Sequence, residues 1–180
     1  MPQLENLSID QHRQALTRAK AAALRFLATR SRSVAEVRRR LALRYSPDVV
    51  QTIIEDMQEQ GYLNDIAFAK EWREQRERTR PRSEMQVRQE LLRLGVEEDV
   101  VKEALAGFDA CENAYLAAHS LAYRLNMSDY PQFRRRLWSY LYRRGFDPTV
   151  TGDTVLCLWR ELTDSLNRDI NASADEQQTD

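Results

Sequence analysis

One pattern of residues occurs twice in this sequence, 50 positions apart. Arg32-Ser33 precedes Val37 and Leu41, and Arg82-Ser83 precedes two apolar residues at the same spacing. A third copy continues the series, because three residues of the second copy have counterparts another 50 positions on: Val87, Leu91 and Gly95 match Leu137, Leu141 and Gly145. Self-similarity at this length is typical of repeat proteins, in which each unit packs mainly on its neighbours. The sequence therefore predicts three tandem units.

Each unit is predicted to contain three helices. The 180 residues include only 5 glycines and 5 prolines, and this scarcity of helix-breaking residues favours helix throughout. Helix starts are marked by capping boxes at Ser33–Glu36 and Ser83–Gln86, and by Ser46-Pro47, with proline at the first helical position. The expected fold is all-α: three tandem three-helix repeats forming an elongated, curved array. The competing fold is a compact helical bundle, which would show the same periodicity.

The expected boundaries follow from this helix pattern. The sequence predicts a flexible lead, three repeats and a disordered acidic tail, over residues 1–14, 15–61, 62–110, 111–167 and 168–180. Helical pattern begins near Ala15, and the last helix is expected from about Asp153 to Asn167. Asp, Asn and Gln are frequent after that helix, and this composition is typical of disordered segments.

A corner between two helices joins the first two units. One helix is predicted to end at Gly61, because glycine adopts the left-handed conformation that closes a helix. Asn64 is a good N-cap for the next helix, and Asp65 places negative charge in its first turn. Leu63 and Phe68 have the spacing of a hydrophobic staple. One face of the second helix is apolar: Phe68, Ala69 and Trp72. The corner is structural, so function is expected on the surfaces that it positions.

Charge is distributed unevenly, although the formal net charge is only −1. Residues 13–44 hold ten basic residues against one acidic residue, whereas residues 161–180 hold six acidic residues against one basic residue. Only three of the 27 basic residues are lysines, and arginine is the better ligand for phosphate and carboxylate groups. Arginine clusters recur in all three units. They indicate either a solvated face or a ridge that binds an anionic partner.

No active site or cofactor site is predicted. His12 and His119 have no acidic or cysteine partners at ligand spacing, and His119 is expected to be partly buried. The glycines lie scattered at helix ends rather than in a phosphate-binding loop. The chain has no signal-peptide pattern and no apolar run near the ~20 residues that a membrane span requires. We expect a non-enzymatic, cytoplasmic monomer that binds no metal, cofactor or membrane.

The helical corner resembles that of the RecX family of bacterial regulatory proteins. The matching residues are Gly61, Tyr62, Leu63, Asn64, Asp65, Phe68, Ala69 and Trp72. Further support comes from Arg82-Ser83 and Leu94-Gly95-Val96, and the resemblance covers roughly residues 15–167. Asn64 stands where many members have a second aspartate, a change that preserves capping. His119 occupies the aromatic position of the third copy.

The resemblance implies a regulator of RecA in DNA repair, recombination and the SOS response. Members of the family bind in the groove of the RecA filament on single-stranded DNA and suppress its ATPase, strand-exchange and co-protease activities. From charge placement we predict these contact residues: Arg32, Arg38, Arg39, Arg40, Arg76, Arg78, Arg80, Arg82, Arg134, Arg135, Arg136, Arg143 and Arg144. The alternatives are a helical module that binds DNA directly, without acting through RecA, and a structural adaptor with no nucleic-acid role.

Overall fold

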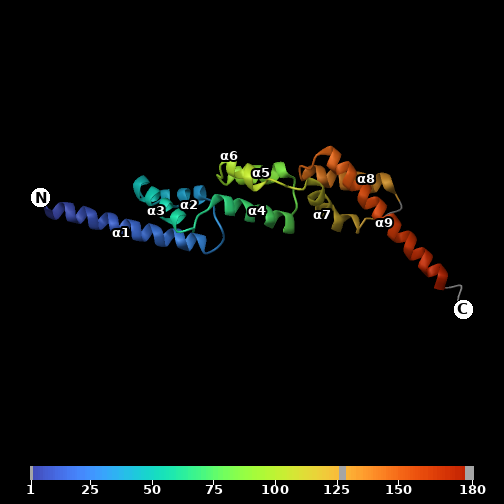
Figure 1. The fold of residues 1–180 in the computed structure, drawn as a ribbon, viewed down its shortest axis with the longest axis horizontal. Coiled ribbons are helices and arrows are strands. Elements are labelled where there is room, and N and C mark those ends of the chain that lie inside the picture. The colour runs from blue at the N-terminus through green and yellow to red at the C-terminus, as the bar shows by residue number, and fades with distance from the viewer. Residues whose placement is uncertain (1, 126–128, 177–180) are drawn as a thin grey trace. The chain divides into compact units, whose positions relative to one another are not determined.

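The computed structural model describes residues 2–125 and 129–176, with the side chains of residues 10–125 and 129–168. All regular elements among these residues are helices, which confirms the predicted all-α fold. Their bounds are α1 (Pro2–Leu27), α2 (Val34–Ala42), α3 (Pro47–Glu59), α4 (Asp65–Thr79), α5 (Glu84–Arg93), α6 (Glu98–Ala104), α7 (Ala110–Ala122), α8 (Tyr130–Arg143) and α9 (Pro148–Glu176) (Figure 1). The described helices follow one another as three sets of three, as the repeat predicts.

Both terminal helices are longer than the sequence predicted. α1 begins at Pro2, where a flexible lead was expected over residues 1–14, and α9 runs from Pro148 to Glu176, into the expected disordered tail over residues 168–180. Met1 and residues 177–180 of these two segments lie outside the described residues. No glycine or proline lies between Pro2 and Pro47, or after Gly152. Since polar residues disfavour helix only weakly, nothing stops either helix where its apolar pattern ends.

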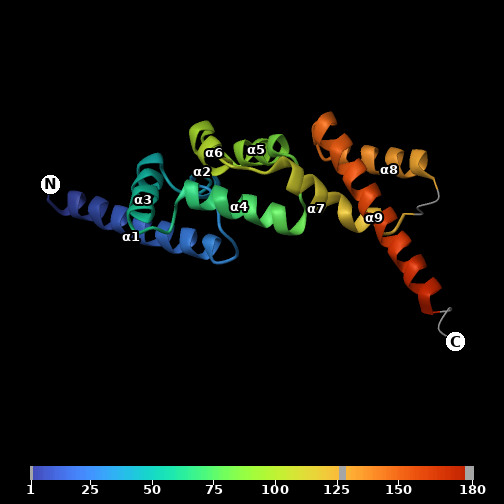
Figure 2. The same ribbon diagram turned by 45° about the vertical axis from the view of Figure 1, so that its right-hand side comes forward.

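The first and third repeats each have a core of their own. Helices α1, α2 and α3 pack against one another in pairs, and so do α7, α8 and α9 (Figure 2). The core of the first repeat includes Ala19, Ala23, Val37, Leu41, Val50, Ile53, Ile54 and Met57. The core of the third includes Ala114, Ala118, Phe133, Leu137, Leu141, Val155 and Leu158. The buried apolar residues of α2, α3 and α8 recur every three or four positions and face these cores, as the helical period requires.

Polar contacts between α7 and α9 add to the third core. The hydroxyls of Tyr115 and Tyr123 both donate to Glu161, with shortest O···O distances of 2.9 Å. Burial, followed by this hydrogen bond, raises the pKa of Tyr115 to about 12. His119 is half-buried between the two tyrosine rings, 5.4 and 4.5 Å from their centroids. Glu161 thus belongs to the folded repeat rather than to a solvated acidic segment.

The chain divides into two compact units. One consists of residues 1–73 and 88–106, and the other of residues 74–87 and 107–180. The middle repeat contributes to both units, because the division passes through α4 and α5. Its buried apolar residues include Phe68, Ala69, Val87, Leu91, Val101 and Leu105.

A joint inside the first unit places the turn after α5 against the start of α2. Ser33 caps α2 in the predicted capping box with Glu36, and its hydroxyl also donates to the carbonyl of Leu94 at 2.6 Å. Gly95 has φ +86°, and a Cβ on it would lie only 2.3 Å from the Cβ of Ala35. Gly95 is therefore required both for its backbone conformation and for the close approach to α2.

The same joint recurs inside the second unit, where the turn after α8 lies against the start of α5. The Ser83 N–H donates to the carbonyl of Arg144 at 3.2 Å, and a Cβ on Gly145 would lie 2.7 Å from the Ser83 hydroxyl. The predicted second capping box is only half formed. Ser83 accepts from the N–H of Gln86, but the Gln86 side chain donates to the Arg143 carbonyl instead. The period of 50 residues in the sequence thus reflects a repeated joint.

Candidate functional site

The arginine run of α2 faces outward, as predicted. Arg38, Arg39 and Arg40 are all exposed, whereas Val37 and Leu41 on either side of them are buried. Arg38 donates to the Gln51 side chain at 2.7 Å. Arg39 donates to the Leu94 carbonyl at 3.1 Å and therefore belongs to the joint between α2 and the end of α5. Arg38 and Arg40 remain the α2 arginines best placed to contact a partner.

Arg32, in contrast, is held inside the first repeat. Its side chain is only 16% exposed, and its guanidinium lies 4.1 Å from the centroid of the Phe26 ring. It donates to Glu36 and to the Thr29 hydroxyl, and Arg30 donates to Glu36 as well, at 2.7 Å. The structure therefore gives Arg32 a packing role within the repeat, which the sequence did not predict.

The carboxylate of Glu36 links the stability of this network to pH. Partial burial alone would raise the pKa of Glu36, but hydrogen bonds from Arg30, the Ser33 N–H and Arg32 outweigh it and hold the pKa below its usual value. A lowered pKa means that the stabilisation is present above the unfolded-state value and is lost as pH falls through the folded-state value.

Glu36→Gln should therefore destabilise the protein by about 1 kcal/mol at neutral pH, because glutamine can complete the capping box but cannot pair with two arginines. Thermal unfolding of both proteins between pH 7 and pH 3 measures the effect. The difference between them should shrink as Glu36 is protonated, and an equal difference at both ends of the range would contradict this assignment.

The predicted cluster on the joint after α4 is mixed. Arg78 and Arg80 are exposed, whereas Arg76 and Arg82 are half-buried and have interaction partners within the chain. In the middle repeat, Arg88 of α5 forms an ion pair with Glu98, and the same helix carries Glu84 and Glu90. α5 therefore lacks the outward run of arginines that α2 and α8 carry, whereas the sequence predicted arginine clusters in all three repeats.

Helix α8 carries the second outward run, with Arg134, Arg135 and Arg136 exposed between buried residues. Three of its arginines and one from the end of α7 line a groove of about 530 Å³: Arg135, Arg136, Arg143 and Arg124. Leu121, Leu125 and Tyr140 provide apolar surface there, and none of the described residues that line it is acidic. Arg134 lies over Trp138, and Arg144 lies 3.9 Å from the centroid of Tyr140. Arg124 has no local sequence signal, because only the packing of α7 beside α8 brings it here.

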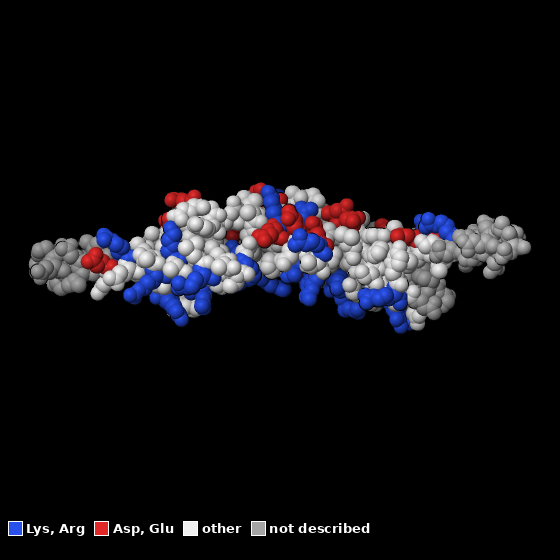
Figure 3. Space-filling view, turned by 90° about the horizontal axis from the view of Figure 1, so that it is seen from below, with Lys and Arg blue, Asp and Glu red and all other residues white. Residues whose placement is uncertain are grey.

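The first repeat separates its charges by helix. α1, α2 and the loops that follow them carry its arginines, and α3 carries most of its acids: Asp48, Glu55, Asp56 and Glu59. Figure 3 shows the result, with Lys and Arg along one edge of this repeat and Asp and Glu along the opposite edge. In the third repeat, α8 contains four arginines and no acidic residue, and a fifth arginine, Arg144, is its C-cap. Such one-sided surfaces attract anionic partners.

The predicted corner motif forms as expected. Gly61 has φ +75°, and the Tyr62 N–H donates to the Met57 carbonyl, which closes α3. Asn64 Oδ1 accepts the Ala67 N–H at 2.9 Å. Asp65 does more than the sequence indicated, because its carboxylate accepts the N–H of Val34 at the start of α2 at 2.9 Å. Burial raises the pKa of Asp65, and this hydrogen bond opposes the rise.

The apolar face of α4 is also confirmed. Phe68 and Ala69 are buried, and Trp72 is half-buried with its ring centroid 5.9 Å from that of Phe68. The indole N–H of Trp72 donates to Glu90 on α5 at 2.9 Å. These contacts show that the corner residues have structural roles, with the exception of the Tyr62 side chain.

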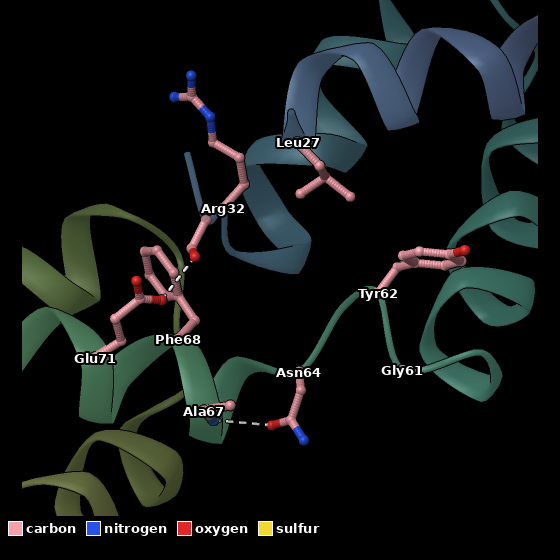
Figure 4. A pocket seen from close by; sticks show the side chains of 9 residues that line it. Leu27, Arg32, Gly61, Tyr62, Asn64, Ala67, Phe68 and Glu71 are labelled. Atoms are coloured by element: carbon pink, nitrogen blue, oxygen red, sulfur yellow. Dashed lines mark hydrogen bonds between the residues drawn. The ribbon is translucent and has the colours of Figure 1, made fainter. Parts of the chain in front are cut away.

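The corner borders a pocket of about 270 Å³ (Figure 4). Its lining residues come from the end of α1, the loop that follows, and the corner itself: Leu27, Ser31, Arg32, Gly61, Tyr62, Asn64, Ala67, Phe68 and Glu71. Tyr62 is 55% exposed and its hydroxyl makes no hydrogen bond with the described residues. Glu71 accepts a hydrogen bond from the Ser31 hydroxyl at 2.6 Å.

No group of three or more His, Cys, Asp or Glu residues in the described part of the chain could hold a metal ion. Among the same residues, no helix is both long enough and apolar enough to cross a membrane.

Known proteins are similar to this chain in sequence and in fold. Residues 19–57 match the model of the first three-helix domain of RecX, and residues 64–105 match that of the second. Regulatory protein RecX of Mycobacterium ulcerans (strain Agy99) is 34% identical over 143 residues, which cover 77% of this chain and 83% of that protein. Regulatory protein RecX of Mycobacterium tuberculosis (strain CDC 1551 / Oshkosh) is 31% identical over 146 residues, covering 77% and 84%. The crystal structure of RecX from Lactobacillus salivarius matches 81% of this chain and 97% of its own, with a TM-score of 0.70 and 20% identity.

Proposed function

This chain belongs to the RecX family, and from that premise we propose that it binds the groove of the RecA filament on single-stranded DNA and inhibits RecA. The inhibited activities are the ATPase, strand exchange and the co-protease activity, so the protein acts in DNA repair, recombination and the SOS response. It acts by binding, as a cytoplasmic monomer without a cofactor. The observation that carries the proposal is the exposure of arginine runs on α2 and α8, each beside a buried core face.

The filament offers two kinds of anion, DNA phosphates and protein carboxylates, and guanidinium groups form paired hydrogen bonds with both. Arg38 and Arg40 of α2, the exposed Arg78 and Arg80, and the arginines of α8 are the proposed contacts. A protein held along the groove would block entry of a second DNA, hinder rearrangement of neighbouring RecA protomers and limit filament growth.

The alternative is a module that binds DNA directly. The groove beside α8 favours it, because arginines next to an aromatic ring are typical of single-strand binding surfaces. Direct binding predicts affinity for free DNA that falls steeply with salt, without any effect on RecA.

Titration of this protein into RecA ATPase reactions on single-stranded DNA, at two salt concentrations, tests the proposal. We expect inhibition at both concentrations, with more protein needed at the higher salt because surface charges are screened. Unchanged ATPase activity at protein concentrations that bind free DNA would overturn the proposal and support the alternative.

A further inference from the structure

The pocket at the helical corner differs in charge from the arginine surfaces of the same repeat. Glu71 forms no ion pair with any described residue, and its one hydrogen bond comes from the neutral Ser31 hydroxyl. Lys70, next to Glu71 in the sequence, pairs with Glu103, and Arg30 and Arg32 on the loop before α2 are both bound to Glu36. Glu71 is therefore an uncompensated carboxylate at the edge of a pocket.

Three of the remaining lining residues, Leu27, Ala67 and Phe68, suit an aliphatic chain. Leu27 projects from α1 on one side of the space, and Phe68 and Ala67 from α4 border it on another (Figure 4). Tyr62 adds a ring that is 55% exposed and free of hydrogen bonds to the described residues. Aromatic faces attract cations within about 6 Å of the ring centroid. The volume of about 270 Å³ lies below the ~300–1,000 Å³ of pockets for drug-sized ligands, so a single side chain suits it better.

We propose that this pocket binds a lysine or arginine side chain of a protein partner. Both side chains combine an apolar stem with a cationic head; the stem matches Leu27, Ala67 and Phe68, and the head matches the Glu71 carboxylate. An anionic group would be repelled by Glu71, and Arg32 already donates to Glu36 and Thr29. A purely apolar side chain would remove water from Glu71 without replacing its hydrogen bonds, which is unfavourable. A cation is the occupant that pairs with the Glu71 carboxylate.

The identification of this partner as the RecA filament rests on the proposed function, whereas the chemistry of the pocket does not. The arginine surfaces and the pocket would then select opposite charges on the filament. Such a combination fixes the register of a complex, because a shifted position would bring like charges together.

Two small probes test the pocket by itself in the full chain labelled with ¹⁵N. The probes are arginine and citrulline, each blocked at both ends as acetyl methylamides, since citrulline has nearly the same shape without the charge. We expect the arginine probe to shift the amide signals of Tyr62, Ala67 and Glu71, with at least tenfold weaker binding of the citrulline probe. Equal responses to the two probes would overturn the proposal.

Variants of α4 and the corner provide the matched controls. Glu71→Gln should reduce binding of the arginine probe about tenfold, since it removes a charge-assisted contact. Glu74→Gln removes the same charge from an exposed position of α4 outside the pocket lining and should leave binding unchanged. Tyr62→Phe should bind like the wild type and Tyr62→Ala more weakly, because the ring rather than the hydroxyl makes the contact. Unchanged binding by Glu71→Gln would contradict the proposal.

The RecA ATPase assay then identifies the partner. Glu71→Gln should raise the concentration for half-inhibition about tenfold, and Glu74→Gln should not change it. If the wild type inhibits RecA and Glu71→Gln inhibits it equally well, the filament is not the partner that fills the pocket. If the wild type fails to inhibit RecA, the proposed function fails, and the probe experiment still decides the chemistry of the pocket.

Discussion

Gly95→Ala should be the most destabilising of the glycine substitutions, with a loss of about 2–5 kcal/mol. A left-handed backbone costs an alanine roughly 1–2 kcal/mol, and overpacking a tight contact costs roughly 1–3 kcal/mol more. Both costs apply at Gly95, where φ is +86° and the new Cβ would lie 2.3 Å from the Cβ of Ala35. Urea unfolding followed by circular dichroism measures the loss.

Substitutions of the other glycines measure the backbone cost and the overpacking cost separately. Gly61→Ala has the backbone cost alone, since φ is +75° and nothing lies within 4 Å of the new Cβ, so about 1–2 kcal/mol is expected. Gly145→Ala should be intermediate, because its closest neighbours are side-chain atoms of Ser83 and Gln86, which can move. Ala35→Gly combined with Gly95→Ala should recover the packing cost. If Gly95→Ala and Gly61→Ala are equally stable, the close joint does not exist.

Reversing the charges of Arg38 and Arg40 to glutamate should raise the concentration for half-inhibition of RecA ATPase by about a hundredfold or more. Each charge-assisted contact contributes roughly 1.5 kcal/mol or more, and reversal adds repulsion to its loss. Arg39 is left unchanged because its hydrogen bond to the Leu94 carbonyl supports the joint. The assay is the ATPase titration on single-stranded DNA, with circular dichroism to verify helix content.

Arg18 and Arg25 provide the matched control for net charge. Both are exposed on α1 of the same repeat and lie outside the predicted contact set. Reversing them changes the net charge by the same amount, so a much smaller effect is expected if α2 touches the partner. Equal effects of the two double variants would show that inhibition depends only on the overall electrostatic field of the protein. No effect of the α2 variant would remove α2 from the contact surface.

Features that depend on neighbours in the sequence were predicted well. The capping box of Ser33, the left-handed Gly61 and the N-cap Asn64 each involve hydrogen bonds within six residues along the chain. The outward direction of Arg38–Arg40 also follows from the helical period. The ends of α1 and α9 were predicted poorly, because no strong breaker marks where those helices stop.

The roles of single arginines could not be predicted in this way. The sequence grouped Arg32 and Arg39 with Arg38 and Arg40, but Arg32 packs on Phe26, and Arg39 binds a carbonyl 55 positions away. Arg124 joins the α8 groove only because α7 packs beside α8. An arginine side chain can reach several partners, and the nearest one is known only once the helices are packed.

Local patterns in the sequence were enough to predict helices in three repeated sets and the buried face of most helices, because these properties depend on residues within one or two helical turns. The packing of the helices fixed which charges remain available to a partner. It bound Arg39 to the Leu94 carbonyl, left Glu71 without an ion pair at the corner pocket, and replaced half of the Ser83 capping box by carbonyls of the third repeat. These outcomes depend on distances between groups that lie far apart along the chain, and packing alone fixes those distances.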